Sequence, residues 1–471
     1  MKIPYGRSDF GQIRSGGFFY ADKTPFLPRL ESDEHGYAHL LFLRPRRFGK
    51  STLLSMLEHY YDVNREGQFD ELFGGLWIHE HPTAERNRYL VLSFDFSQVA
   101  TDRGHDALFR TFLEAVRTGV ESFLIAYRGR VPELARLDER LSTFQDPEAL
   151  IAALMGLLRR SPHEVYVLVD EYDHFANKLL AGGSQDMYEK LVKDSGFVRG
   201  FFATLKAGTG SGVVARMFIT GVSPLVLDDM SSGFNIASNV SLDPVLNTMA
   251  GLTRGEVGRA LDELLAQSPA LLGSPETPDR EHLLELLEKY YDGYRFSEDA
   301  AERVFNSDMV LYFLSQLRRM GALPLEMLDQ NARTDHRHLQ RIGTLAGAGA
   351  SERRALLETI LSDGYVRSDL VRQFGVKSLT SRAAYISLLY YMGILTLSGA
   401  PREVEGYTLE IPNRVIRELQ WEHLAVMLEE QAQVVIQVDD LRARCTRWGI
   451  AICSWAHPRA RRRPATPGSW S

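Results

Sequence analysis

The sequence predicts an α/β fold, with a mostly parallel β-sheet that carries helices on both faces. Three observations predict it. From the N-terminus to about residue 245, apolar segments typical of strands alternate with helical patterns. An early strand runs into a basic loop and a helix, and a later, entirely apolar strand ends in two adjacent acids. Alternation of this kind favours parallel strands that are joined by helices.

The loop after the early strand has the composition of a phosphate-binding loop. We expect the strand at 37–43, the loop Arg-Pro-Arg-Arg-Phe-Gly-Lys-Ser at 44–51 and the helix at 51–58. Such a loop wraps polyphosphate with backbone N–H groups, and the helix N-terminus adds partial positive charge. A lysine reaches the terminal phosphates, and a hydroxyl ligates magnesium. The residues expected to bind the nucleotide are Arg46, Arg47, Phe48, Gly49, Lys50, Ser51 and Thr52, with Ser51 also as a metal ligand.

One position departs from the full pattern of such loops. The pattern has glycine seven residues before Ser51, where this chain has Arg44, followed by Pro45. Gly49 keeps the freedom to adopt a positive φ. Considered alone, the segment is also compatible with a basic turn in front of an amphipathic helix.

The acidic strand supplies the usual partner of a phosphate-binding loop. Residues 165–169 are too apolar for an exposed strand and suit a central parallel strand that is covered on both faces. In P-loop ATPases an acid at its end holds Mg²⁺ directly or through water, and the next glutamate polarises the attacking water. We assign these roles to Asp170 and Glu171. The alternative is an ordinary strand followed by a polar helix cap.

Two further strands complete the expected sheet, at 89–96 and at 213–219. The second ends at Thr220, at the tip of the strand expected beside the acidic one. In ring-forming and related ATPases a polar residue there senses the γ-phosphate, so Thr220 is a candidate catalytic residue, although a hydroxyl also simply ends many strands. Ligands of parallel sheets lie beyond the carboxyl ends of the strands, so Lys50, Asp170 and Thr220 should converge.

Six segments, in this order, resemble the bacterial and archaeal AAA-ATPase-like family: 19–24, 44–51, 169–173, 220–224, 232–237 and 291–296. The resemblance covers roughly residues 1–425, and the family habitually has arginine at the position of Arg44. Its members often carry a C-terminal PD-(D/E)XK nuclease-like domain. After Trp421 we find no acid followed by an acid-x-lysine on adjacent strands. We therefore predict no nuclease activity, and a truncated or frame-shifted C-terminal part.

The composition shifts along the chain predict four regions. Amphipathic helices fill 253–317, a helix–strand–strand–helix order follows at 378–419, and the end is rich in arginine and proline. A winged helix either packs against a nucleotide domain or grips DNA, and the lack of a concentrated basic face favours the first use. The predicted regions are an AAA-like P-loop ATPase domain at 1–245, a helical domain at 246–375, a winged-helix-like domain at 376–425 and a disordered or truncated tail at 426–471.

Composition narrows the class of protein. The 471 residues are 44% hydrophobic, enough for substantial cores, and the net charge of −7 argues against a surface that coats nucleic acid. The N-terminus lacks the apolar core of a signal peptide, and no stretch of about 18 apolar residues predicts a membrane span. A cytoplasmic location follows. The two cysteines, Cys445 and Cys453, provide no disulfide framework.

These observations predict an ATP-binding P-loop protein in which Mg²⁺-dependent hydrolysis drives or gates a conformational switch. Two alternatives stay open: a slow-hydrolysing nucleotide-gated regulatory or scaffold protein, and a DNA-processing accessory factor. Expected cofactors are ATP and Mg²⁺, and expected partners are the nucleotide and either another protein or a second copy, with DNA as the alternative and no membrane. Residues 19–24 either contact adenine or cap a helix, and Arg216 and Arg295 are conceivable arginine fingers.

Overall fold

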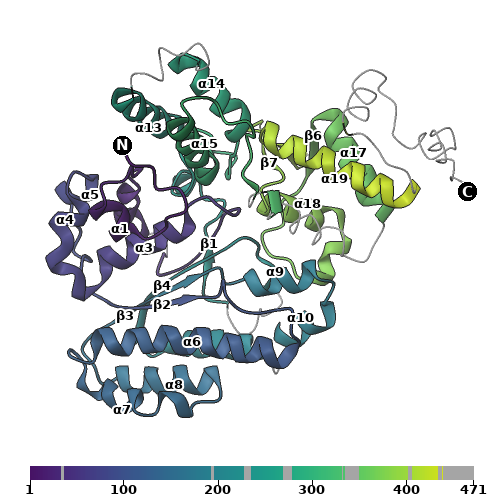
Figure 1. The fold of residues 1–471 in the computed structure, drawn as a ribbon. Coiled ribbons are helices and arrows are strands. Elements are labelled where there is room, and N and C mark those ends of the chain that lie inside the picture. Colours follow the sequence, from purple (N-terminus) through teal and green to yellow (C-terminus); the bar gives the residue numbers. More distant parts are fainter. Residues whose placement is uncertain are drawn as a thin grey trace, which may run out of the picture.

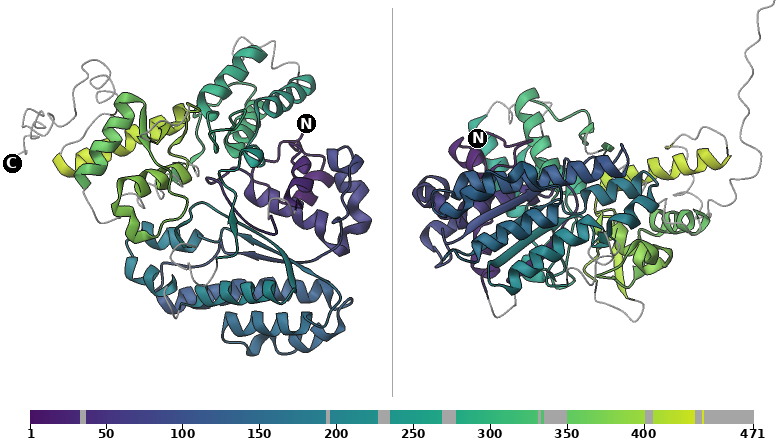
Figure 2. Two further views of the ribbon diagram at one scale, coloured as in Figure 1. Left: turned by 180° about the vertical axis from the view of Figure 1, so that it is seen from behind. Right: turned by 90° about the horizontal axis from the view of Figure 1, so that it is seen from below.

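The computed structural model describes residues 1–32, 37–192, 196–226, 235–268, 278–330, 333–334, 350–400, 406–432 and 438. An α/β part around a five-stranded sheet lies beneath a helical part that carries a small second sheet (Figure 1). The N-terminal helices and helix α19 (Arg414–Ala432) lie on opposite sides of the molecule in every view (Figure 2). One hydrophobic core runs through both parts, since buried side chains from 1–250 and from 252–428 belong to one cluster.

The large sheet has the strand order β2-β3-β4-β1-β5, and all its neighbouring strands are parallel. Strand β4 therefore lies between the strand that leads into the loop and the strand that ends in the acids. This arrangement confirms the predicted α/β fold with a parallel sheet. The strands are β1 (His39–Leu43), β2 (Leu90–Asp95), β3 (Val165–Asp170), β4 (Val214–Gly221) and β5 (Ser238–Asn239).

Burial explains why these segments form central strands. Val165 to Val169 of β3 are all buried, as a strand covered on both faces requires. Helix α6 (His105–Tyr127) lies directly on β2. At Gly119 of that helix, a Cβ atom would come within 2.6 Å of the Ser93 carbonyl oxygen, so glycine permits the close approach. Helices α3 (Lys50–Tyr61) and α11 (Phe197–Gly210) contact β3 and β4 respectively.

Shorter helices fill in the rest of the α/β part. Helix α8 packs against both α6 and α11, and its first turn is capped by Asp146, whose side chain accepts two backbone N–H groups. These helices are α1 (Phe10–Ser15), α2 (Leu27–Leu30), α4 (Phe69–Phe73), α5 (Trp77–Glu80), α7 (Ala135–Asp138), α8 (Pro147–Leu158), α9 (His174–Ala181) and α10 (Gln185–Val192).

The C-terminal half has the predicted helices and a small antiparallel sheet of order β6-β8-β7. The predicted helix–strand–strand–helix order is present as α18, β7, β8 and α19, and its interpretation as a winged helix stays a prediction. The elements are α13 (Arg254–Gln267), α14 (Arg280–Tyr291), α15 (Ser307–Met320), α17 (Ala350–Asp363), β6 (Tyr365–Ser368), α18 (Arg382–Tyr391), β7 (Thr396–Leu397), β8 (Tyr407–Glu410) and α19.

Two elements cross the predicted region boundaries. Strand β6 precedes residue 376 yet pairs with β8, so the small sheet begins before the boundary expected at 375. Helix α19 continues to Ala432, past the boundary expected at 425, and Leu428 beyond that boundary is still buried. Apart from residue 438, the rest of the predicted tail lies outside the described residues. No helix in the described part of the chain is long and apolar enough to cross a membrane.

Candidate nucleotide-binding site

The loop at 44–51 lies between the end of β1 and the start of α3, as expected. Two of its residues have a left-handed backbone: Gly49, with a φ of 86°, and Arg47, with a φ of 70°. A positive φ is ordinary for glycine and strained for arginine. Strain of this kind persists where surrounding structure enforces it, and it is concentrated at functional sites.

Arg44, at the position of the usual first glycine, holds the start of the loop in place. Its guanidinium is buried and donates hydrogen bonds to the carbonyl oxygens of Leu43 (2.9 Å), Ser241 (2.8 Å) and Leu246 (3.0 Å). It also stacks on the ring of Phe296, with 4.1 Å from the guanidinium carbon to the ring centroid. Burial lowers the pKa of Arg44 to about 10, so it stays charged at neutral pH. Arg44 therefore fixes the start of the loop to the segment after β5.

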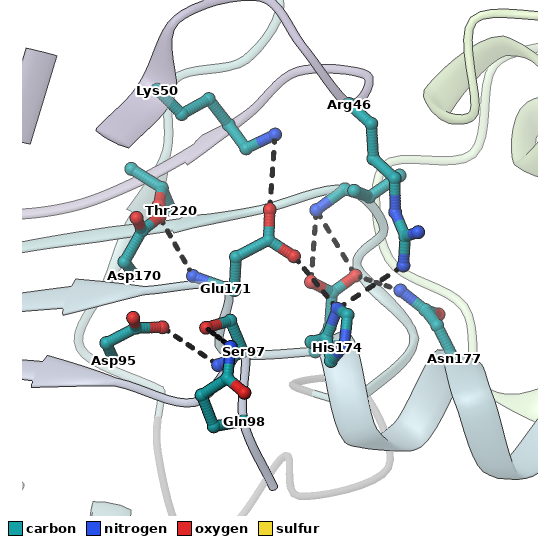
Figure 3. A network of polar contacts seen from close by, with 12 residues as sticks. Arg46, Lys50, Asp95, Ser97, Gln98, Asp170, Glu171, His174, Asn177 and Thr220 are labelled. Atoms are coloured by element: carbon teal, nitrogen blue, oxygen red, sulfur yellow. Dashed lines mark hydrogen bonds and ion pairs between the residues drawn. The ribbon is translucent and has the colours of Figure 1, made fainter. Parts of the chain in front are cut away.

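Lys50 points into the mouth of the loop. Its ammonium is 4% exposed and donates to the carbonyl oxygens of Arg44 and Pro45, each at 3.1 Å. The same nitrogen lies 3.8 Å from Oε1 of Glu171 (Figure 3). The lysine thus bridges the loop and the acidic strand, which are more than 100 residues apart in the sequence.

Asp170 is the centre of a compact set of oxygen atoms. Ser51 Oγ donates to Asp170 Oδ2 at 2.6 Å, and Thr220 Oγ1 donates to Asp170 Oδ1 at 2.5 Å. Burial raises the pKa of Asp170, although both hydrogen bonds act in the opposite direction. The three residues come from α3, β3 and β4, and Lys50, which was expected to converge with Asp170 and Thr220, reaches the adjacent Glu171. Hydroxyl and carboxylate oxygens are ligands that Mg²⁺ prefers, so Ser51 and Asp170 fit a magnesium ion.

Glu171 follows β3 with a left-handed backbone, its φ being 51°. Its Oε2 lies 3.2 Å from Nδ1 of His174, and its Oε1 faces Lys50. Burial acts to raise the pKa of Glu171, but the hydrogen bond to His174 and the charge of Lys50 outweigh it and lower the pKa to about 2. The carboxylate is therefore ionised at neutral pH and held between two partners.

The segment after Glu171 contains two site residues to which the sequence assigned no role, Asp173 and His174. Buried Asp173 accepts the backbone N–H groups of Val222 and Ser223, which follow β4, and thereby ties the start of α9 to that segment. His174 Nδ1 lies 3.3 Å from Nη2 of Arg46 in the loop. Their position beside the Asp-Glu motif could have drawn attention to these two residues. Their partners could not be predicted, because those partners lie far away in the sequence.

The remaining predicted loop residues differ in where their side chains go. Arg46 points toward His174, beside Glu171 (Figure 3). Arg47 turns the other way and forms an ion pair of 2.5 Å with Asp308 of α15. The ring of Phe48 is buried against aromatic rings of the helical part. Only the backbone of Phe48 is therefore available to a ligand of the loop.

The start of α15 supports the loop from behind. Asn306 donates to the carbonyl oxygen of Arg46, and Ser307 to that of Phe48, each at 3.3 Å. The backbone N–H of Asp308 donates to the carbonyl oxygen of Arg47 at 3.2 Å. The helical part therefore contacts three consecutive residues of the loop.

A small apolar cavity of about 80 Å³ adjoins the loop near Gly49 and Thr52. Of the segment 19–24, Phe19, Tyr20 and Lys23 line it. Asp22 instead accepts hydrogen bonds from the backbone N–H and hydroxyl of Thr24 and from the backbone N–H of Trp77, at the start of α5. Other lining residues are Leu53, Met249, Leu252 and Leu311.

A larger polar cavity of about 740 Å³ reaches Ser51 and Asp170 from between α3, β2 and α6. Hydroxyl and carboxyl side chains line much of it, among them Ser55, Glu58 and Ser93. It opens to solvent, so water has a path to the acidic end of β3.

Neither conceivable arginine finger is directed at this site within its own chain. Arg216 lies near the beginning of β4, where it donates to Tyr89 Oη and to the carbonyl oxygens of Leu30 and Glu31, each at 3.2 Å. Arg295 donates to the carbonyl oxygen of Ala300 at 3.0 Å.

A lysine- and serine-bearing loop at a helix N-terminus, facing an Asp-Glu pair at the end of a parallel strand, defines the P-loop ATPase class. Residues 4–231 of the chain match the AAA-ATPase-like family model, which is described as a predicted AAA-ATPase. The region in which a nuclease-like domain would follow lies outside the described residues.

The chain is also similar to an uncharacterized protein in the vnfD 5' region of Azotobacter chroococcum mcd 1, with 27% identity over 320 residues. The match covers 66% of this chain and 52% of that protein, so this chain spans about half the length of the relative it matches.

Two solved structures share low identity with the chain. The Walker-type ATPase of Pyrococcus abyssi is 14% identical, with a TM-score of 0.44 and coverage of 85% of this chain and 95% of that one. The Aeropyrum pernix ORC2 protein, in ADPNP and ADP complexes, is 12% identical, with a TM-score of 0.33 and coverage of 92% and 97%. Neither likeness indicates a function for this chain.

Proposed function

We propose that this P-loop protein binds ATP together with Mg²⁺ and hydrolyses it at the end of β3. The observation that carries the proposal is the meeting of Lys50, Ser51, Asp170, Glu171 and Thr220 at one loop mouth. These residues supply an ammonium, a hydroxyl–carboxylate pair, a second carboxylate and a further hydroxyl. Phosphoryl transfer from a nucleotide needs this set of groups.

In the proposed mechanism Lys50 exchanges its partners when the triphosphate binds. Its ammonium now donates to two carbonyl oxygens of the loop. Phosphate oxygens carry more charge than carbonyl oxygens, so the ammonium forms stronger hydrogen bonds with them. Backbone N–H groups at the start of α3 bind the same phosphates. The apolar cavity beside Gly49 is the proposed position of the base.

Ser51 and Asp170 are the proposed magnesium ligands. When bound, the ion would neutralise charge on the phosphates. Ser51, which now donates to Asp170, would offer its hydroxyl oxygen to the ion, and Thr220 would keep the other carboxylate oxygen oriented. Thr220 is also the residue that we propose to contact the γ-phosphate from β4.

Glu171 is the proposed group that polarises the attacking water. Without nucleotide its pKa of about 2 makes it a weak base. Movement of Lys50 toward the phosphates removes a positive charge from the carboxylate, and loss of a positive neighbour raises the pKa of an acid. Nucleotide binding itself thereby increases the basicity of Glu171.

Two substitutions test the proposal, read out by fluorescent-ATP affinity and phosphate release. Lys50→Ala should weaken ATP binding by about a hundredfold, because a charged hydrogen-bonding partner of the phosphates is lost. Glu171→Gln should keep the affinity and lose turnover by roughly a hundredfold or more. Lys178→Ala, on the exposed face of α9, is the matched control and should change neither quantity. Unchanged affinity in Lys50→Ala contradicts the proposed site.

A second candidate, a nucleotide-gated switch with slow hydrolysis, is favoured by the contacts between α15 and the loop. A change in loop shape on nucleotide binding would act directly on the helical part through these contacts. Multiple-turnover kinetics separate the two candidates. Rapid cycling of the isolated protein contradicts the slow switch, and a single turnover that is followed by tight product retention supports it.

A further inference from the structure

We propose that His174 is a positioning residue that connects the phosphate loop to Glu171. This inference rests on the proposed hydrolysis at the same site and extends it to a residue outside the loop and acid motifs. In this proposal His174 makes no contact with the phosphates. It acts by holding the carboxylate of Glu171 and by sensing where Arg46 lies.

The imidazole is held firmly. Its side chain is 12% exposed and belongs to the first residue of α9. The backbone N–H of His174 donates to the Glu171 carbonyl oxygen at 3.0 Å, and the preceding Asp173 is anchored to the segment after β4. The backbone that carries the ring is therefore tied to the segments after both β3 and β4.

A single nitrogen atom faces two groups with opposite requirements (Figure 3). His174 Nδ1 lies 3.2 Å from Oε2 of Glu171, a carboxylate that only accepts hydrogen bonds. It lies 3.3 Å from Nη2 of Arg46, a guanidinium that only donates. When Nδ1 carries a proton it can donate to Glu171 and cannot accept from Arg46. When it carries none, the reverse holds, so the two contacts exclude each other.

This exclusion lets loop occupancy control the base. Arg46 belongs to the phosphate loop, and a guanidinium binds phosphate strongly, so a bound triphosphate draws Arg46 away from His174. His174 Nδ1–H then donates its hydrogen bond to Glu171 alone. Lys50 leaves Glu171 for the same phosphates, so the contact with His174 sets the orientation of the carboxylate toward the water.

The test compares substitutions at His174 by ATP affinity and by phosphate release. His174→Ala should lower kcat by roughly tenfold to a hundredfold, with affinity changed less than about twofold, because misplacing a catalytic group mainly costs rate. His174→Gln, whose amide N–H can still donate, should restore part of kcat. In a Glu171→Gln background, His174→Ala should cause less than about twofold further loss, because the residue through which it acts is already disabled.

Several outcomes overturn the inference. Unchanged kcat in His174→Ala overturns it, as does a full additional loss in the Glu171→Gln background. Parallel loss of affinity and kcat, or a lowered melting temperature in both His174 variants with no rescue, shows a structural histidine instead. If Lys50→Ala binds ATP normally, the proposed function itself fails. If Lys50→Ala and Glu171→Gln behave as expected and the His174 results do not, only the present inference fails.

Discussion

The two ends of the large sheet both bury clusters of charged and polar side chains, yet they differ in how those side chains are paired. At the carboxyl end, Lys50 is bound by loop carbonyl oxygens and shares Glu171 with His174. At the opposite end, Arg216 lies 11% exposed between Tyr89, Glu85 and two carbonyl oxygens. Burial of charge therefore does not identify a ligand site by itself.

The proposed function distinguishes the carboxyl end, because there the pairings would be exchanged for a ligand. Lys50 and Ser51 begin helix α3, Ser51 and Asp170 line the larger cavity, and Glu171 and Arg47 have left-handed backbones. The Arg216 cluster joins the start of β4 to the segments around Leu30 and Tyr89, so its interactions stabilise the fold.

The largest expected effect comes from comparing one substitution at each end of the sheet. One should change mainly the stability of the protein, and the other mainly its affinity for ATP. Arg216→Ala should reduce the free energy of unfolding by about 3 kcal/mol, because it removes a buried guanidinium and leaves the carbonyl oxygens of Leu30 and Glu31 without its hydrogen bonds. It should leave ATP affinity within about twofold. Lys50→Ala should show the reverse pattern. Urea denaturation and fluorescent-ATP titration on both variants measure this, and a similar stability loss in the two would remove the distinction between the ends.

Local patterns predicted the sheet and the motif residues because their causes are local. A strand covered on both faces must be apolar at every position, and a phosphate loop needs glycine, lysine and a hydroxyl at fixed spacing. Strand β6 was not predicted, since four residues acquire strand geometry only by pairing with β8, about 40 positions later.

The partners of the loop arginines could not be predicted, for a related reason. Arg46 meets His174 across 128 positions, and Arg47 meets Asp308 across 261. A charged residue in a sequence carries no sign of which distant opposite charge it will face. The resemblance to a family located the motifs and the replacement at Arg44, but the three carbonyl partners of Arg44 emerge only from the fold.

A second prediction uses the pH dependence of stability to distinguish Glu171 from the adjacent Asp170. The pKa of Glu171 lies below its ordinary value of 4.5, at about 2, so folding favours its ionised form. Its contribution, roughly 3 kcal/mol, is complete above about pH 4.5 and is lost as the pH falls toward 2. The stability difference between wild type and Glu171→Gln should therefore shrink over that range in urea titrations.

For Asp170, the same experiment should show the opposite change of stability with pH. Burial raises its pKa, so folding disfavours its ionised form, and wild type should gain stability relative to Asp170→Asn as the pH falls. Equal pH slopes for the two variants would contradict the assignment of Glu171 as the carboxylate that Lys50 and His174 stabilise.

The smallest expected effect concerns Thr220, which links β4 to Asp170. Thr220→Val keeps the shape of the side chain and removes the hydrogen bond to Asp170 Oδ1. We expect turnover to fall about fivefold, equivalent to about 1 kcal/mol, with stability changed by a similar amount at most. Thr220→Ser retains the hydroxyl and should restore the rate, as measured by phosphate release. If valine and serine give equal rates, Thr220 only ends its strand, and the functional cluster at this end of the sheet is limited to the loop and β3.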